Sequence, residues 1–310
     1  MNDVMRHEDA RKQFGLRNWR RSASDTWRHG ASAVLTLTFD LDAESAVLAR
    51  SEAAAHDLST MSHQAYGPQT ALPRILTLLS ETDVAATFFV PGESARRWPH
   101  AVESVLDRGH EVALHSDLHK PLTAMSDAQQ ADDLHANIEA LNTLGAQPVG
   151  YRAPNWQLTT RTLELLIDNG LTYDSSLMDD DRPYVIDHPA GRIAELPVHW
   201  SLDDWEQYAF LPEPDIGQVI NTPSTVRELW IGELDAMRAT GSLCNICAHP
   251  FLSGRPSRLK VVADLIAFAR ECNDVEILRC DVLAQRVLQA DFRTSLGAVG
   301  QAESAVPRRS

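Results

Sequence analysis

The chain has 310 residues, 44% of them hydrophobic, and a formal net charge of −15 at pH 7. This length suits one large α/β domain, because such folds run to roughly 250 residues before insertions. The acidic balance argues against a nucleic-acid partner or an anionic membrane surface. No stretch approaches the roughly 20 apolar residues that a membrane span needs. We therefore expect a globular protein of the cytoplasm.

The first 29 residues differ from the rest, because basic residues outnumber acidic ones there. The pair Arg20-Arg21 is typical of a twin-arginine export signal, but the residues that follow contain no apolar run. We interpret residues 1–30 as an N-terminal arm that carries Trp19 and Trp27. An exposed aromatic arm usually has something to cover it, so we predict a homo-oligomer.

The four cysteines do not form the pattern of a disulfide framework. Cys244 and Cys247 have Cys-x-x-Cys spacing, but they lie in an apolar, strand-like run. Redox motifs of that spacing open helices instead. We expect two reduced thiols packed near the core.

Strand-like and helix-like segments alternate along the chain. The predicted strands are Val34–Asp42, Val84–Val90, His110–His115, Pro148–Arg152, Leu171–Ser175, Ile193–Pro197, Leu243–Ala248 and Val275–Leu278. The predicted helices are Ala71–Glu81, Ala95–Arg108, Asp127–Leu144, Thr160–Asn169, Thr225–Ala239, Pro256–Glu271 and Val282–Leu288. Residues 178–223 read as largely irregular. Repeated strand–helix units imply parallel strands with crossover helices, and their number favours a barrel over an open sheet.

Four predicted strands end in ionisable residues. Side chains alternate between the faces of a strand, so Asp40 and Asp42 share one face. His115, Arg152 and His249 lie at the carboxyl ends of three other strands. Catalytic groups of barrel enzymes gather at that end. We therefore predict that these residues meet in one site.

Asp40 with Asp42, and His115 with His119, indicate a metal site with a spare carboxylate. Each pair alone has an ordinary explanation, because aspartates cap helices and lone histidines are commonly structural or exposed. Together they favour a zinc-like ion bound for hydrolysis, since imidazole and carboxylate are the ligands of such ions.

The motifs resemble those of the polysaccharide deacetylase family, the NodB-homology or carbohydrate esterase 4 type. Thr-Phe-Asp-Leu-Asp, His-Ser-Asp-Leu-His, Arg-Ala-Pro-Asn-Trp and Ala-His-Pro occur in the family's order between about residues 34 and 281. Residues 173–184 and 195–205 resemble the branch of the Helicobacter-type peptidoglycan deacetylase, cyclic imide hydrolases and allantoinase-like proteins. The resemblance implies a distorted (β/α)7 barrel and a hydrolase of non-peptide carbon–nitrogen bonds. We place this barrel, with long loop insertions, at residues 31–292 and a loose tail at 293–310.

The resemblance also implies that Asp42, His115 and His119 bind the metal and that Asp40 is the catalytic base. The common family motif has adjacent aspartates, whereas Leu41 separates them here. The alternation of side chains along the strand keeps both carboxylates on one face, but it does not decide which aspartate binds the metal and which is the base. The metal would be zinc or another divalent ion such as cobalt, nickel or manganese.

A mechanism follows as a hypothesis. An ion with three protein ligands keeps a position for water and lowers the pKa of that water to about 7. Asp40 takes the proton, and Arg152 holds Asp40 ionised and oriented. His249 protonates the departing nitrogen.

The substrate is less clearly indicated. Trp156, Tyr184, Trp200 and Trp205 are candidates for the pocket, although aromatic residues also serve cores and interfaces. We favour a small cytoplasmic cyclic amide, an imide or ureide, because an export signal is missing. The alternative is a peptidoglycan or other N-acetyl-sugar deacetylase. A non-catalytic metabolite-binding protein and a metal-free relative are remoter alternatives.

Overall fold

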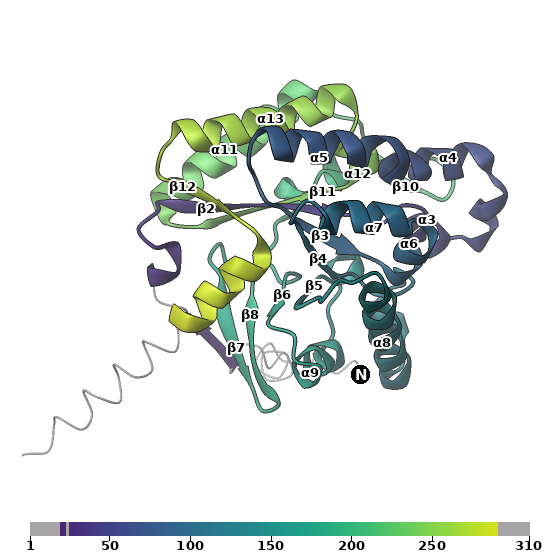
Figure 1. The fold of residues 1–310 in the computed structure, drawn as a ribbon, viewed down its shortest axis with the longest axis horizontal. Helices are drawn as coiled ribbons and strands as arrows, with labels where there is room; N and C mark the ends of the chain where they lie inside the picture. The colour runs from purple at the N-terminus through teal and green to yellow at the C-terminus, as the bar shows by residue number, and fades with distance from the viewer. Residues whose placement is uncertain (1–18, 23–24, 291–310) are drawn as a thin grey trace, which may run out of the picture.

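This computed structural model describes residues 19–22 and 25–290, and a curled sheet forms its centre (Figure 1). The strands follow the order β1-β7-β8-β6-β5-β4-β3-β2-β11, and β12 also pairs with β2. Their bounds are β1 (Arg20–Ser22), β2 (Ala33–Asp40), β3 (Thr87–Val90), β4 (Glu111–Leu114), β5 (Gly150–Tyr151), β6 (Tyr173–Asp174), β7 (Tyr184–His188), β8 (Gly191–Glu195), β11 (Leu243–Ala248) and β12 (Val275–Leu278). A separate hairpin pairs β9 (Phe210–Leu211) with β10 (Ile216–Gln218).

The strands from β8 through β6, β5, β4, β3 and β2 to β11 run parallel. At one end β7 joins antiparallel to β8, and β1 joins antiparallel to β7. The predicted α/β barrel is thus confirmed as a curled mixed half-barrel. Parallel order brings the carboxyl ends of distant strands to one rim, which is what positions the site.

A seam separates β8 from β11, and side chains span it. Within the described ranges, no strand ladder joins these two strands. Asn245 on β11 donates to the backbone oxygens of Leu196 (3.2 Å) and Pro197 (3.1 Å), just beyond β8. Its amide oxygen accepts from Thr36 on β2 at 2.8 Å. The buried Asn245 amide therefore helps to close the barrel wall at this seam, together with a backbone bond from the Asp204 N–H to the Cys247 oxygen at 2.9 Å.

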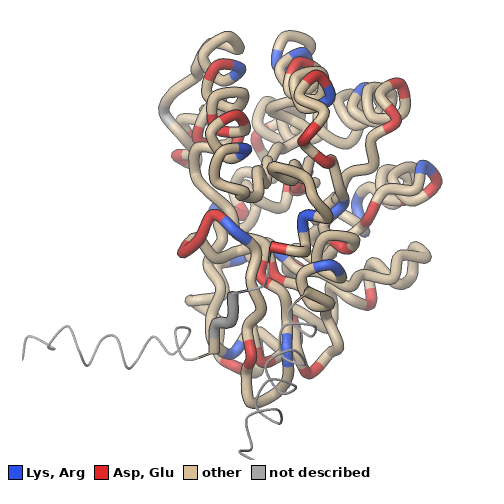
Figure 2. The backbone as a smooth tube through the Cα atoms, turned by 90° about the vertical axis from the view of Figure 1, so that its left-hand side faces the viewer, with Lys and Arg blue, Asp and Glu red and all other residues tan. Residues whose placement is uncertain are grey.

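Helices surround the curled sheet (Figure 1). Their bounds are α3 (Ser45–Leu48), α4 (Leu58–Tyr66), α5 (Leu72–Glu81), α6 (Gly92–Arg97), α7 (Pro99–Leu106), α8 (Asp127–Thr143), α9 (Thr160–Asp168), α10 (Trp205–Tyr208), α11 (Pro223–Thr240), α12 (Pro250–Ser253) and α13 (Pro256–Glu271). A further helix spans 280–290. None of the helices in the described chain is long and apolar enough to cross a bilayer. Figure 2 shows that acidic and basic residues are spread over the outer elements.

The sheet has an apolar layer on each side. Outside it, α5 buries Leu72, Ile75, Leu76 and Leu79, the helical stripe that the sequence predicted. Inside the barrel, Val34, Phe89 and Tyr173 pack with Leu283 and Val287 of the helix over 280–290. Each fully buried large side chain stabilises the fold by roughly 1.5–3 kcal/mol.

Three predicted segments differ in the structure. The helix predicted over 95–108 is two helices, α6 and α7, because Pro99 lacks an N–H and starts a new helix. The region predicted as irregular contains β7, which lies between β1 and β8. Within the predicted arm, β1 pairs with β7 and Trp27 is buried at 1% exposure. Trp27 therefore serves the protein's own core, not an exposed contact.

Candidate active site

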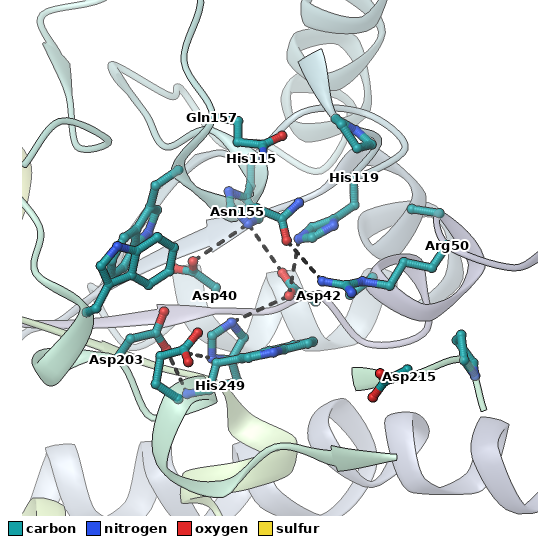
Figure 3. A pocket seen from close by; sticks show the side chains of 18 of the residues that line it. Asp40, Asp42, Arg50, His115, His119, Asn155, Gln157, Asp203, Asp215 and His249 are labelled. Carbon is teal, nitrogen blue, oxygen red and sulfur yellow. Dashed lines mark hydrogen bonds and ion pairs between the residues drawn. The ribbon is translucent and has the colours of Figure 1, made fainter. Parts of the chain in front are cut away.

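The carboxyl ends of β2, β4 and β11 open into a cavity of about 780 Å³. Figure 3 shows the ionisable side chains turned toward one another in this cavity. The predicted site residues that line it are Asp40, Asp42, His115, His119, Trp156, Trp200, Trp205 and His249. Arg152 lies directly behind the wall and is fully buried. The structure thus gathers residues that are far apart in the sequence.

Asp42, His115 and His119 form a compact set of ligand atoms. His115 Nε2 lies 3.4 Å from Asp42 Oδ1, and His119 Nε2 lies 3.3 Å from Asp42 Oδ2. All three residues are buried. The ligand atoms of the trio lie within 4.8 Å of one another, so one ion can reach all of them.

The donor set suits a divalent cation. Both carboxylate oxygens of Asp42 are buried and accept no hydrogen bond within the described structure. An unsatisfied buried carboxylate is costly, and a bound cation removes that cost. His115 Nδ1 donates to the backbone oxygen of Arg152 at 2.7 Å, which leaves Nε2 with its lone pair toward Asp42. Burial opposes the charge of Asp42, but the imidazoles of His119 and His115 outweigh it and hold the pKa of Asp42 well below its usual value.

Asp40 is oriented by a buried arginine. Arg152 Nη1 donates to Asp40 Oδ1 and to the Thr38 hydroxyl, each at 2.7 Å. The same guanidinium lies 4.1 Å from the centre of the Phe89 ring. Asp40 Oδ2 faces the set Asp42, His115 and His119, and lies 3.6 Å from His115 Nε2. Arg152 therefore fixes one oxygen of Asp40, and the other oxygen is directed into the cavity toward His115.

His249 stands across the cavity and is oriented by Asp204. Its Nδ1 donates to Asp204 Oδ1 at 2.7 Å, and its Nε2 lies 3.6 Å from Asp42 Oδ2. Burial disfavours the protonated ring, but the hydrogen bond to Asp204 and the charges of Asp204 and Asp203 raise the pKa of His249 to about 10. The side chain is thereby prepared to give up a proton from Nε2.

Asp204 was missing from the sequence prediction. It is fully buried and accepts from the backbone N–H of His249 and from the Ser253 hydroxyl as well. The signal that could have found it is the tandem pair Asp203-Asp204 in an aromatic loop. Burial raises the pKa of Asp203 to about 7, although the charge of His249 opposes this.

The loop between His115 and His119 is held by α8. Asp133 Oδ1 accepts from the Ser116 hydroxyl at 3.0 Å and from the Asp117 N–H at 3.1 Å. Asn137, one turn later, accepts from the His115 N–H at 2.9 Å. Ser116 and His119 have left-handed φ values of 63° and 56°, which such anchors help to maintain. The sequence prediction also lacked these two α8 residues.

The aromatic candidates fall into two groups. The rings of Trp156 and Trp200 lie 4.4 Å apart at the cavity, and the Trp205 ring lies 5.0 Å from that of His249. Tyr184 does not line the cavity, which corrects its place among the pocket residues. It is a buried residue of β7, and its hydroxyl donates to Asp179 at 2.6 Å. Tyr184 packs in the same apolar layer as the α5 stripe, and the sequence, which predicts no strand at β7, could not assign it to that face.

The cysteines are free, and Cys244 and Cys247 are buried, as predicted. Cys247 does not only pack in the core, because its thiol also donates a hydrogen bond to Asp40 Oδ2 at 3.4 Å. Burial holds its pKa well above the usual value, so it remains a neutral thiol.

Comparison with known proteins gives concordant similarities. The family model for polysaccharide deacetylase matches residues 65–173. A crystal structure of a Mycobacterium smegmatis protein, described as a polysaccharide deacetylase, has 40% sequence identity and a TM-score of 0.83. The superposition covers 94% of this chain and 97% of that one.

A peptidoglycan deacetylase of Helicobacter pylori is 28% identical over 255 residues, which are 74% of this chain and 87% of the relative. The crystal structure of the Puue allantoinase has a TM-score of 0.74 at 23% identity, covering 86% of this chain and 93% of that one. At such low identity, the second similarity concerns the fold alone.

Proposed function

Because this chain belongs to the polysaccharide deacetylase family, which hydrolyses amide carbon–nitrogen bonds outside peptides, we propose that it is a metal-dependent N-deacetylase of an N-acetylated amino sugar. The observation that carries the proposal is the convergence of Asp42, His115 and His119 between two oriented groups. Asp40, fixed by Arg152, stands on one side. His249 stands on the other.

A divalent metal, which we propose to be zinc, would supply a Lewis acid and a water of lowered pKa. Asp42, His115 and His119 would hold it. Asp40 is placed to accept the proton of the attacking water, since its Oδ2 faces the ligands. His249 is placed to donate a proton to the leaving nitrogen. Its partner Asp204 accepts from Nδ1 and favours the protonated ring, which leaves the Nε2–H free to be donated.

An amino-sugar substrate is supported by the relatives and by the cavity. The Helicobacter pylori relative, aligned over 87% of its length, is a peptidoglycan deacetylase. The cavity of about 780 Å³ is in the range of small-ligand sites, and Trp156 and Trp200 offer ring faces for stacking on a sugar. A sugar residue therefore agrees with both the size and the lining of the site.

A small cyclic amide is the second candidate. The reacting groups lie at most 6% exposed at the base of a walled cavity, which suits a compact ring that can be enclosed. A cytoplasmic location would favour this substrate, and cell fractionation tests it. Homo-oligomerisation stays a prediction as well, for light scattering of the purified protein.

The test is a metal-dependent substrate panel. The protein is treated with a chelator, and zinc, cobalt, nickel or manganese is added back. Acetate release from chitooligosaccharides and peptidoglycan fragments is measured beside ring opening of succinimide, hydantoin and allantoin. We expect acetate release that disappears on chelation and returns with metal. Full turnover without metal contradicts the proposal, and ring opening alone replaces it by the cyclic-amide function.

A further inference from the structure

We propose that Arg50 is a specificity-determining residue that binds a carboxylate of the substrate. The preferred substrate would then be an N-acetylated amino sugar that carries an acidic substituent near the scissile amide. This inference rests on the proposed deacetylase function and adds a chemical class to it. Arg50 has no part in the metal set or in proton transfer.

Arg50 lines the cavity, and no carboxylate of the described residues forms an ion pair with it. It follows α3 and is the one lysine or arginine among the described residues that line the cavity. Its side chain is exposed there. Arg152, in contrast, is buried and already forms an ion pair with Asp40. A solvent-facing guanidinium is therefore available for a carboxylate, which its planar fork can bind with two hydrogen bonds.

The guanidinium is also held in position. Arg50 Nη2 donates to Asn155 Oδ1 at 3.3 Å, and its central carbon lies 6.0 Å from the Trp205 ring centre. Figure 3 shows the end of the Arg50 side chain turned toward Asn155 and Asp42. A held arginine loses less freedom on binding than a free surface arginine does.

The residues that hold Arg50 have unusual backbone conformations. Asn155 and the next residue, Trp156, have left-handed φ values of 51° and 53°. Such conformations cost stability and cluster at ligand-binding sites. Asn155 presents its amide oxygen to Arg50, and Trp156 presents its indole to the cavity. This turn and Arg50 therefore form one side of the cavity, where a substrate group can bind.

The remaining charges give the cavity a direction. Asp203, Glu206 and Asp215 also line it, and all are acidic. Figure 3 shows Asp203 beside His249 and Arg50 at the opposite side of the metal ligands. Arg50 is therefore the lysine or arginine of the described lining that can attract a substrate carboxylate. A carboxylate bound at Arg50 would lie on the other side of the cavity from His249, which leaves the amide between Asp40 and His249.

The experiment uses two disaccharides that differ by one carboxylate. The neutral one is di-N-acetylchitobiose, and the acidic one has N-acetylmuramic acid, which carries a lactyl carboxylate, as its second sugar. Acetate release is measured for the wild type, Arg50→Gln and Arg50→Lys. Arg108→Gln is the matched control, because Arg108 is exposed, does not line the cavity, and its side chain donates to the backbone oxygen of Ser104 in α7.

We expect Arg50→Gln to raise KM for the acidic disaccharide about tenfold or more with a small change in kcat, and to leave the neutral one unchanged. Arg50→Lys should recover part of the loss, and Arg108→Gln should behave as wild type. Added salt should raise the wild-type KM for the acidic disaccharide but not for the neutral one, a measurement that needs no variant.

Equal changes for both disaccharides, or none, overturn the role of Arg50 and leave the deacetylase function standing. Hydrolysis of neither disaccharide by the wild type with metal present overturns the deacetylase function, and the inference with it. Thermal unfolding of each variant separates these results from a loss of folding.

Discussion

At Asp40, two neighbours assign different tasks to the two carboxylate oxygens. Oδ1 is bound by Arg152 at 2.7 Å, and Oδ2 faces His115 Nε2 at 3.6 Å. Asp42, in contrast, has two buried oxygens without a hydrogen-bond partner in the described structure. This difference favours Asp42 as the ligand and Asp40 as the base.

Asp40→Asn keeps the shape and removes the base. We expect kcat to fall about 10²- to 10⁴-fold, because that is the usual contribution of general base catalysis. Metal content, measured by mass spectrometry after gel filtration, should stay at the wild-type level. A variant that loses the metal would instead exchange the roles of the two aspartates.

The main site residues could be predicted because strand phase and motif spacing are local properties. Two short motifs contain them: Asp-Leu-Asp holds Asp40 and Asp42, and His-Ser-Asp-Leu-His holds His115 and His119. Asp204 does not, because its role comes from a contact with His249, 45 residues away. Such a long-range contact produces no local motif or periodic pattern, so the sequence alone does not indicate it.

Among the elements, α8 holds the loop that carries two of the proposed metal ligands. Asp133 anchors the loop that separates His115 from His119. We expect Asp133→Ala to weaken metal affinity about 10- to 100-fold, as loss of outer-shell anchors does. Retained metal is measured across graded chelator concentrations.

The matched control is Asp132→Ala, since Asp132 is exposed on the same helix. Its metal retention should equal that of the wild type. A similar loss in both variants would point to a general effect on α8 and not to the loop anchor.

The ends of β6 and β8 hold a pair of buried carboxyl groups. Asp174 Oδ2 and Glu195 Oε2 are buried and receive no hydrogen bond from another described group, so one proton shared between them satisfies both. Burial, with the nearby charge of Asp174, raises the pKa of Glu195 well above 4.5. Burial also raises the pKa of Asp174 to about 6.

The sign of the pH effect follows from these raised values. The folded state keeps a proton that the unfolded state releases above pH 4.5, so the pair's stabilisation is lost as the pH rises through the raised pKa values. In Glu195→Gln, an amide replaces the protonated acid and keeps the hydrogen bond. We expect the urea-unfolding free energy of this variant to depend less on pH between 5 and 9. The difference in slope should approach about 1.4 kcal/mol per pH unit where one proton is involved.

Glu276→Gln provides the comparison, because Arg286 lowers the pKa of Glu276 through a hydrogen bond. In Glu276→Gln, the unfolding free energy should fall with rising pH as it does in the wild type. If it falls equally in Glu195→Gln, the proton shared by Asp174 and Glu195 is not the source of that pH dependence.

Most elements could be predicted because hydrophobic periodicity indicates them directly. β11 and α13 have the predicted bounds. The break at Pro99 and strand β7 were not predicted, for different reasons. A proline can continue or restart a helix, and the local pattern does not decide between the two. The position of β7 depends on pairing with β1 and β8, which is a property of the whole sheet.

Across the whole molecule, the N-terminal segment is tied to the barrel interior by Trp27. This residue is 1% exposed and packs in the inner layer with Leu283 of the helix over 280–290. We expect Trp27→Ala to lower the free energy of unfolding by about 3–5 kcal/mol, as the loss of a large buried side chain does. Urea denaturation at one pH measures it.

Phe210→Ala is the control, because Phe210 is 49% exposed. Its unfolding free energy should stay within about 0.5 kcal/mol of the wild type. An equally small effect of Trp27→Ala would mean that the segment before β2 contributes little to the stability of the barrel.

The closure at Asn245 has a consequence for catalytic geometry. A backbone ladder spreads its strength over many equivalent bonds, whereas β11 and the end of β8 are joined through the side chain of Asn245. The same strand carries Cys247 and leads directly into His249. Because β11 is laddered to β2 from Leu243 to Ala248, His249 keeps its place relative to Asp40 and Asp42 even if the Asn245 contact loosens. Such loosening would instead let the segment after β8, which carries Asp203 and Asp204, move away from the rest of the cavity.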